Sequence, residues 1–148
     1  MEERDDSVTN RAGEQVSVET MVFLDRFDAS TTDPTIDLSE LFVDPFLALD
    51  PKGVHALNPT ALAKFLPARR EMFAKAGVTK VSRRSATESP VDGIHRLATV
   101  EWSAERGNGP ALPLRSSFLL RREEGRLRIV VYLNHVDIQA LLAPKEAQ

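Results

Sequence analysis

Hydrophobic residues at helical spacing first occur between residues 17 and 28. Ser17 is a suitable N-cap, because its hydroxyl can accept a backbone N–H of the first helical turn. The apolar positions that follow are Val18, Met21, Val22, Leu24 and Phe27, with Phe23 on the flank. The pattern predicts a helix that ends in the polar run 28–32, ahead of Pro34, which cannot continue a helix.

A longer helical pattern starts at Asn58-Pro59, which places an N-cap residue before a proline at the first helical position. Its apolar positions are Leu62, Phe65, Leu66, Met72, Phe73 and Ala76. Gly77 is a suitable C-terminal stop. We expect this helix to lay one apolar stripe against a sheet.

The segment between these two helices carries weaker signals. A short helix is predicted over residues 36–42, before Asp44-Pro45, and a short strand over residues 46–49. Asp50-Pro51-Lys52-Gly53 has the composition of a turn, because proline presets φ and glycine tolerates positive φ.

After Gly77 the hydrophobic period changes to two, which predicts strands over residues 78–85, 94–105, 114–122 and 127–136. In the second of these strands Trp102 lies on the same side as Ala98 and Val100, opposite Glu101. The centre of the last strand, residues 129–133, is apolar on both faces, which predicts cover on both sides. Helices followed by antiparallel strands favour an α+β fold.

Composition indicates one soluble domain: 148 residues, 42% hydrophobic and 28% charged, with a formal net charge of -3. We assign residues 16–143 to this domain, residues 1–15 to a disordered polar tail without a signal region, and residues 144–148 to a second polar tail. The chain has no cysteine, which excludes disulfides and thiolate chemistry. The same absence of cysteine leads us to expect a cytoplasmic protein. No apolar run approaches the roughly 20 residues that cross a bilayer, so we expect no membrane binding.

The order of motifs along the chain resembles a known family. Leu41-Phe42-Val43-Asp44 and Leu49-Asp50-Pro51-Lys52-Gly53 precede the Asn58-Pro59 helix, and an acidic glycine turn precedes Leu127-Arg128-Ile129. This order is similar to the nuclear transport factor 2-like superfamily, in particular its SnoaL-like polyketide cyclase and ketosteroid isomerase-like branch. The resemblance implies a cone-shaped, cystatin-like fold, in which a curved antiparallel sheet wraps around N-terminal helices and forms an apolar pocket. It also implies a homodimer that forms through the sheet face.

The same resemblance makes Asp50 the candidate general base. In ketosteroid isomerases an Asp followed by Pro, one further residue and Gly transfers the proton, and an apolar setting keeps its pKa near the working pH. The alternative is a turn-forming Asp whose oxygens accept backbone N–H groups. Phe23 and Phe118 stand where these isomerases have two oxyanion hydrogen-bond donors, and neither side chain can donate. Their loss argues against dienolate chemistry by the isomerase mechanism.

The candidate ligand-binding residues are aromatic or polar side chains set among apolar neighbours, as a ligand pocket requires. They are Phe23, Phe46, His55, Trp102, Phe118, Tyr132 and Asn134. Each also has a structural interpretation: Trp102 in the core or a dimer interface, His55 in a loop, and Tyr132 packed under a helix. The expected ligand is an apolar or aromatic small molecule.

Signals for other chemistries are weak. His135 and Asp137 are two residues apart and could orient a general base or hold a metal, but no third ligand has matching spacing, so no metal site is predicted. Basic residues of the strands, including Arg83 and Arg128, are interpreted as a solvated outer sheet face, because no aromatic stacking pattern typical of a nucleic-acid surface accompanies them. No glycine-rich phosphate loop is present, and no cofactor is expected.

Three functions therefore stay open. The first is a small-molecule-binding domain with an apolar cone pocket. The second is a cofactor-independent isomerase, dehydratase or cyclase that uses Asp50. The third is a non-catalytic dimerisation or scaffold module whose cone is filled by its own side chains. The fold alone does not choose among them.

Overall fold

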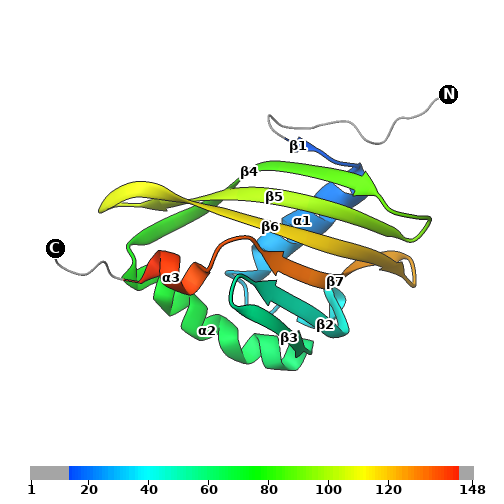
Figure 1. Ribbon diagram of the computed structural model, residues 1–148, viewed down its shortest axis with the longest axis horizontal. Coiled ribbons are helices and arrows are strands. Elements are labelled where there is room, and N and C mark those ends of the chain that lie inside the picture. Colours follow the sequence, from blue (N-terminus) through cyan, green and yellow to red (C-terminus); the bar gives the residue numbers. More distant parts are fainter. Residues whose placement is uncertain (1–13, 144–148) are drawn as a thin grey trace.

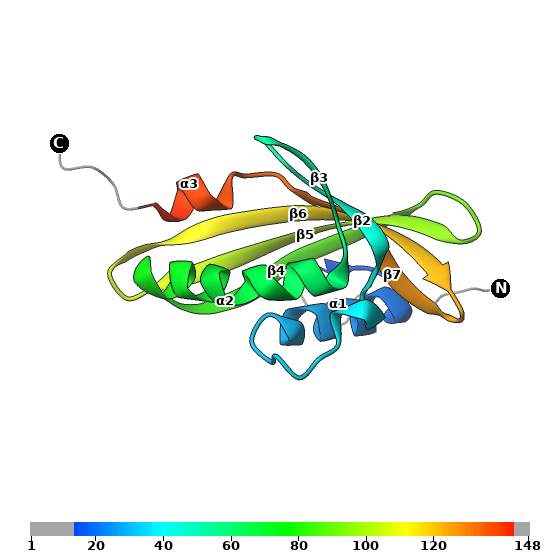
Figure 2. The ribbon, with the colours of Figure 1, turned by 90° about the horizontal axis from the view of Figure 1, so that it is seen from below.

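A curved mixed sheet forms the body of the molecule, and two helices pack on one side of it (Figures 1 and 2). The computed structural model describes residues 14–143, and within them seven strands follow the order β1-β4-β5-β6-β7-β2-β3. The strands are β1 Glu14–Gln15, β2 Phe42–Asp50, β3 Gly53–Leu57, β4 Val78–Pro90, β5 His95–Arg106, β6 Gly109–Glu123 and β7 Arg126–Asn134. The helices are α1 Val18–Ser30, the 3-10 helix η2 Leu38–Glu40, α2 Pro59–Lys75 and α3 Ile138–Leu142. We call the sheet face that packs against α1 and α2 the inner face, and the opposite one the outer face.

The predicted helix starts and stops are confirmed for α1 and α2. The Ser17 hydroxyl accepts the Thr20 N–H over 3.2 Å, and Oδ1 of Asn58 accepts the Ala61 N–H over 2.7 Å. Gly77 ends α2 at φ +86°, a left-handed conformation that favours glycine. A Cβ at this position would also collide with the Asn108 side chain. Local cap chemistry thus fixes where both helices begin and where α2 ends.

The face that α1 buries differs from the predicted one. Val22 was expected on the apolar stripe and Phe23 on its flank, but Phe23 is buried and Val22 is 61% exposed. Val18, one turn earlier, is also exposed. The helix is rotated because Thr20 faces the sheet, where its hydroxyl donates to Glu88 of β4 over 3.3 Å. A buried polar anchor therefore outweighs the two valines in setting the rotation of α1.

The segment before α2 is more extended than predicted. The helix expected over residues 36–42 is wrong except for the single turn of η2, which Asp37 caps through the Ser39 N–H. Phe42 instead begins β2 and pairs with Ile129 of β7. The strand β3 was not predicted, and it pairs with β2 across the expected Asp50-Pro51-Lys52-Gly53 turn. Long-range pairing with β7 decides the conformation of this segment, and the local pattern does not contain that information.

The sheet is mixed, whereas the sequence predicted antiparallel strands. The pairs β1–β4 and β2–β7 are parallel, and the other neighbouring pairs are antiparallel. Glu14 and Gln15, expected in the polar tail, form β1 against Ala86 and Thr87. The remaining tail predictions, for residues 1–13 and 144–148, lie outside the described residues. Because β2 and β7 are joined through α2 and four strands, their parallel alignment follows from tertiary structure.

The predicted alternation of β5 is confirmed. Ala98, Val100 and Trp102 are buried on the inner face, and Glu101 is exposed on the outer face. In β7 a register shift opposite Leu119 and Leu120 inserts Val130, so that Ile129 and Tyr132 are both buried. None of the helices within residues 14–143 is long and apolar enough to cross a membrane.

Candidate functional site

Strand register places most of the predicted site residues on the inner face. Phe118 pairs with Ala98 on one side and with Tyr132 on the other, and Tyr132 pairs with Ala48, which pairs with His55. Directly paired residues share one face of a sheet. Trp102, Phe46 and Asn134 lie on the same face by the same rule, since their partners are Leu114, Leu57 and Ser116.

An aromatic cluster fills the middle of the inner face. Phe27 of α1 lies 5.0 Å from Phe118 and 5.9 Å from Tyr132 between ring centroids, and Phe42 lies 4.5 Å from Phe46. Phe46 and Phe118 have almost no exposed surface. Aromatic contacts of this kind each contribute about 0.5–1.5 kcal/mol beyond the burial of area. At this level of the sheet the cone is therefore occupied by the protein's own side chains.

Two polar side chains of β7 have unused hydrogen-bonding capacity: Tyr132, within this cluster, and Asn134, just beyond it. Asn134 accepts a hydrogen bond from the Ser116 hydroxyl over 2.7 Å, while its amide N–H groups bond to nothing within residues 14–143. The Tyr132 hydroxyl likewise has no hydrogen-bond partner in the described part of the chain. The side chain of Tyr132 is 8% exposed, and its oxygen is not among the fully buried polar atoms that lack a partner. These donors thus remain available at the surface of the inner face.

Asp50 occupies the turn that was its alternative interpretation. Its Oδ1 accepts the N–H groups of Lys52 over 2.8 Å and Gly53 over 3.1 Å, which closes the β2–β3 hairpin. The side chain is partly exposed. His55 lies on β3 in the same hairpin and is exposed. One Asp50 oxygen is therefore committed to the backbone, and the other has no hydrogen bond within residues 14–143.

Phe23 belongs to the same buried core as the other aromatic site residues but lies at the edge nearest the β6–β7 turn. It lines a surface depression of about 580 Å³ between α1 and the β6–β7 turn, together with Val22, Leu41 and Leu127. Among residues 14–143, Phe23 forms none of the ring pairs that join the members of the aromatic cluster. The sequence grouped Phe23 with Tyr132. Both belong to the buried core, but Phe23 lies one helical turn before Phe27 and lines the depression at the β6–β7 turn, which Tyr132 does not line.

A polar network that the sequence did not predict joins α1 to β4 and β5. Arg83 was interpreted as an outer-face residue, but it pairs with Trp102 and its side chain is 2% exposed. Its guanidinium donates to Asp28 and Asp25, each over 2.6 Å, and the Trp102 indole N–H donates to Asp28 over 3.0 Å. Burial raises the pKa of Asp28, and the hydrogen bonds from Trp102 and Arg83 oppose this shift in part. A β-bulge between Arg83 and Ser85 reverses the strand alternation and turns Arg83 inward.

His135 and Asp137 do not act as a pair. The Nε2 atom of His135 lies 2.8 Å from the Ser117 hydroxyl on the outer face. Asp137 caps α3 through the Ala140 N–H and forms an ion pair with Lys52. The hydrogen bond from the Ala140 N–H is the main cause that lowers the pKa of Asp137. No cluster of three potential metal ligands occurs among residues 14–143.

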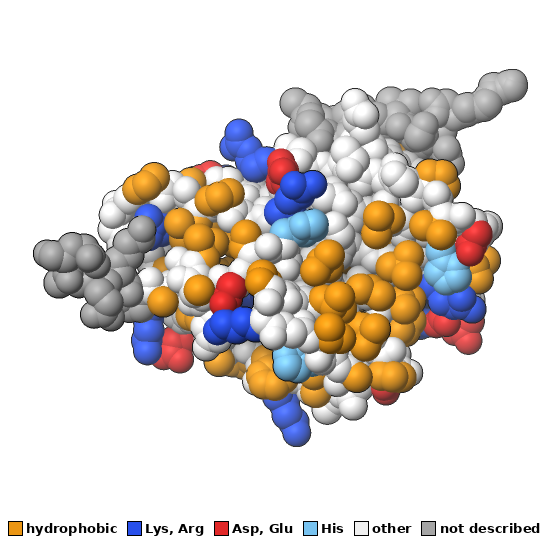
Figure 3. Space-filling view, in the orientation of Figure 1, with side chains coloured by type: hydrophobic (Ala, Val, Ile, Leu, Met, Phe, Trp, Pro, Cys, Tyr) orange, Lys and Arg blue, Asp and Glu red, His pale blue; other side chains and the backbone are white. Residues whose placement is uncertain are grey.

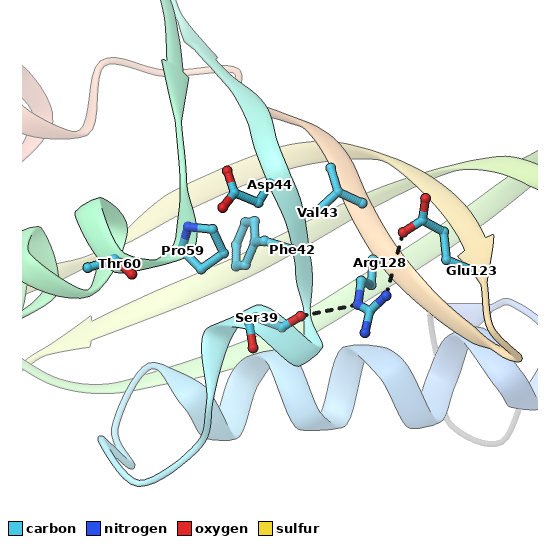
Figure 4. A pocket seen from close by; sticks show the side chains of 8 residues that line it. All are labelled: Ser39, Phe42, Val43, Asp44, Pro59, Thr60, Glu123 and Arg128. Atoms are coloured by element: carbon cyan, nitrogen blue, oxygen red, sulfur yellow. Dashed lines mark hydrogen bonds and ion pairs between the residues drawn. The ribbon is translucent and has the colours of Figure 1, made fainter.

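A smaller depression of about 270 Å³ lies where η2, β2, α2 and β7 meet (Figure 4). Phe42 lies at its centre, and Asp44 and Arg128 lie on different sides of the ring. Arg128 is held by the Ser39 carbonyl over 3.1 Å and by Glu123 over 3.5 Å. None of the residues predicted to bind a ligand lines this depression.

Comparison with solved structures identifies the architecture. One match is a protein of unknown function with a cystatin-like fold from Nostoc punctiforme. The match covers 81% of this chain and 90% of the Nostoc chain, with a TM-score of 0.64 and 16% identity. An NTF2-like protein with a cystatin-like fold from Novosphingobium aromaticivorans matches 86% of this chain over 88% of its own, with a TM-score of 0.62 and 17% identity. The chain has the nuclear transport factor 2-like fold. An NTF-2-like protein of unknown function from Shewanella oneidensis also matches, over 79% of this chain and 96% of its own, with a TM-score of 0.60 and 8% identity.

No protein-family model matches the sequence, and no curated protein matches it in a sequence search. At the low identities of the structural matches, the nuclear transport factor 2-like fold is what the comparisons establish. Since this fold carries unrelated activities, function is argued from the residues of the site.

Proposed function

We propose that the inner face binds a small apolar molecule at the Tyr132–Asn134 end of β7. The observation that carries the proposal is the pair of unused donors, the Tyr132 hydroxyl and the Asn134 amide, two residues apart on the face that the fold curves around its helices. Polar groups of the protein interior are normally hydrogen-bonded to protein or water. Two donors free to bond elsewhere, beside a buried aromatic cluster, are what a specific ligand site requires.

The surroundings define the class of ligand. Leu114 and Trp102 pair with each other on the inner face next to the Ser116–Asn134 pair, and Phe118 flanks Tyr132. Apolar walls with hydrogen-bond donors favour a flat or cyclic molecule that carries an acceptor such as a ketone oxygen. Ser116 orients the Asn134 amide by donating to its oxygen, so the N–H groups face outward from that bond.

Binding is the better proposal than proton transfer by Asp50. One Asp50 oxygen already accepts two backbone N–H groups of its own turn, which is sufficient reason for an aspartate at this position. Phe23, which stands in for an oxyanion donor, lines the depression beside the β6–β7 turn, and Tyr132 does not line it. No hydrogen bond within the described residues links Asp50 to the Tyr132 hydroxyl.

The proposal is tested by calorimetric titration with 1-tetralone, a bicyclic ketone, and tetralin, the same ring system without the oxygen. The wild type should bind the ketone more tightly, by about two- to tenfold, the range of one net hydrogen bond. Tyr132→Phe should reduce this preference while the melting temperature changes little. Ser117→Ala removes a hydroxyl from the outer face of the neighbouring strand and should leave the preference intact. Equal affinity for both probes, or no binding of either, would refute the proposal.

We also propose that the partner of this chain is a second copy, bound through the outer face. Leu97, Leu119, Val131 and Leu47 are paired in one row across β5, β6, β7 and β2. Leu97 and Leu47 are each 42% exposed, and hydrophobic side chains gather over β7 and β2 in the space-filling view (Figure 3). The pattern of β7 predicted cover on both sides, and the described residues leave its outer side partly exposed.

The charged residues beside this row favour pairing with a second copy of the same face over binding to a partner whose charges are all of one sign. On one flank Glu101 faces Arg115, and on the other Arg121 faces Glu123. Each flank thus carries both signs, and a two-fold pairing of identical faces can match them without net repulsion. A strongly basic or acidic partner would meet like charges on either flank.

A further inference from the structure

The helix α1 carries apolar surface that the sheet does not use. Val18 and Val22 are one helical turn apart and are 49% and 61% exposed, although the sequence pattern places them with the buried residues of the same helix. The inner face of the sheet contacts α1 through its other side, where Thr20, Leu24 and Phe27 are buried. Single exposed valines need no explanation, but Val22 lines a depression.

The depression between α1 and the β6–β7 turn, which we call the α1 groove, has an apolar floor. Phe23, Leu41 and Leu127 form this floor and are buried, and Val22 rises beside them. Its volume of about 580 Å³ falls within the range of about 300–1,000 Å³ that small-molecule sites occupy. Apolar surface of this kind favours a ligand that covers it and removes it from water.

The charges of the α1 groove are balanced except at one residue. Arg26 forms an ion pair with Glu40, and Glu19 is bound by Arg96 and Arg122. Arg126, the remaining charged residue of the lining, forms no ion pair with any residue in the range 14–143. The groove therefore presents one uncompensated positive charge next to an apolar surface.

We propose that the α1 groove binds a small amphiphile with a single negative head group, of the class of a medium-chain carboxylate. The alkyl chain covers Val22, Phe23 and Leu127, and the carboxylate pairs with the Arg126 guanidinium. The ion pairs of Arg26 and Glu19 leave those side chains already satisfied, so they neither attract nor repel the head group strongly. This site shares no residue with the inner-face site and does not rest on it.

The test compares octanoate with 1-octanol, which has the same chain and no charge, by ¹⁵N–¹H NMR titration of the full chain at low ionic strength. Octanoate should shift the amide signals of Val22, Gly125 and Leu127 and bind up to about fivefold more tightly than octanol, the scale of a partly exposed ion pair. Arg126→Gln should abolish this preference. The matched variant Arg84→Gln replaces another exposed arginine, on β4, and should retain it.

Val22→Asp should weaken both probes, because it removes apolar area and places a negative charge beside the head group. Both Val22 and Arg126 are exposed, so these variants should melt at the wild-type temperature. Equal affinity for the two probes, an unchanged preference in Arg126→Gln, or octanoate shifts outside the groove would overturn the proposal. Tyr132→Phe separates the two sites: it should leave octanoate binding unchanged, and a loss there would place octanoate on the inner face and refute the α1 groove.

Discussion

The indole N–H of Trp102 donates to Oδ1 of Asp28 over 3.0 Å, which ties the middle of β5 to the last turn of α1. The other carboxylate oxygen of Asp28 accepts from Arg83 of β4. Three elements that are distant in the sequence thus meet at one carboxylate. The network fixes the position of the C-terminal end of α1 on the inner face, where Phe27 packs into the aromatic cluster.

Replacing Arg83 should therefore be more harmful than replacing its neighbour. Arg83→Met leaves the partly buried Asp28 carboxylate without its cation and should lower the free energy of unfolding by about 1–3 kcal/mol. This is less than the about 3–5 kcal/mol of a fully buried pair, because both carboxylates are partly exposed. Arg84→Met, at an exposed position, should change it by less than about 0.5 kcal/mol. Urea denaturation of both variants measures the difference, and equal effects would show that the network does not stabilise α1.

The pH dependence of stability should report the environment of Asp28. Burial raises its pKa above the ordinary value of 3.8, so the folded state holds this proton more tightly than the unfolded state. Binding of this proton stabilises the folded state fully when the pH is below the pKa of Asp28 in the unfolded chain. This stabilisation is lost as the pH rises through the pKa of Asp28 in the folded chain. The stability of the wild type relative to Asp28→Asn should therefore fall as pH rises from about 4, the ordinary pKa of an aspartate. A relative stability that rises with pH would mean that Arg83 dominates and that the pKa of Asp28 is lowered.

Substitution of Asp50 separates its turn role from a catalytic one. Asp50→Asn keeps an oxygen that can accept the Lys52 and Gly53 N–H groups, so its unfolding midpoint should stay close to that of the wild type. Asp50→Ala removes the acceptor of two hydrogen bonds and should cost about 1–3 kcal/mol of stability, since a net hydrogen bond contributes about 0.5–1.5 kcal/mol. Guanidinium denaturation of the two variants measures this difference. Equal stability of Asp50→Ala and wild type would show that the turn does not depend on the carboxylate.

A lysine in the middle of the outer apolar row should break the proposed homodimer. Leu119→Lys places a charge between Leu97 and Val131, where desolvation on association would be unfavourable. Sedimentation velocity should show a dimer for the wild type and a monomer for this variant. Phe65→Lys changes an exposed hydrophobic residue of α2, on the other side of the sheet, and should remain dimeric. A monomeric wild type, or a dimeric Leu119→Lys variant, would contradict the assignment of this face.

Features fixed by local chemistry could be predicted from the sequence. The caps at Ser17 and Asn58, the stop at Gly77 and the alternation around Trp102 depend on neighbouring residues alone, and all are confirmed. The fold class followed from the order of these elements. Tyr132 and Asn134 lie together on the inner face, and the Val130 bulge two residues before Tyr132 contributes to that placement.

Features that depend on distant contacts could not be predicted in the same way. The bulge beside Arg83 reverses which residues face inward, and the strand's own sequence does not mark it. The rotation of α1 is set by Thr20 meeting Glu88, 68 residues later, against the preference of Val22 for burial. Asp28 was interpreted as part of a polar helix end, since only the folded chain brings it to Trp102. Most candidate ligand-binding residues lie on the inner face, and the sequence pattern did not indicate which face of each strand that would be.

The most direct test of the inner-face site is to map where a ligand acts. In a ¹⁵N–¹H titration with 1-tetralone, the largest shifts should occur at the side-chain amide of Asn134 and the backbone amides of Ser116 and Tyr132. Outer-face amides such as Leu97 and Leu119 should stay within the baseline. Shifts confined to the outer face or to the α1 groove, or the absence of saturable shifts, would contradict the account.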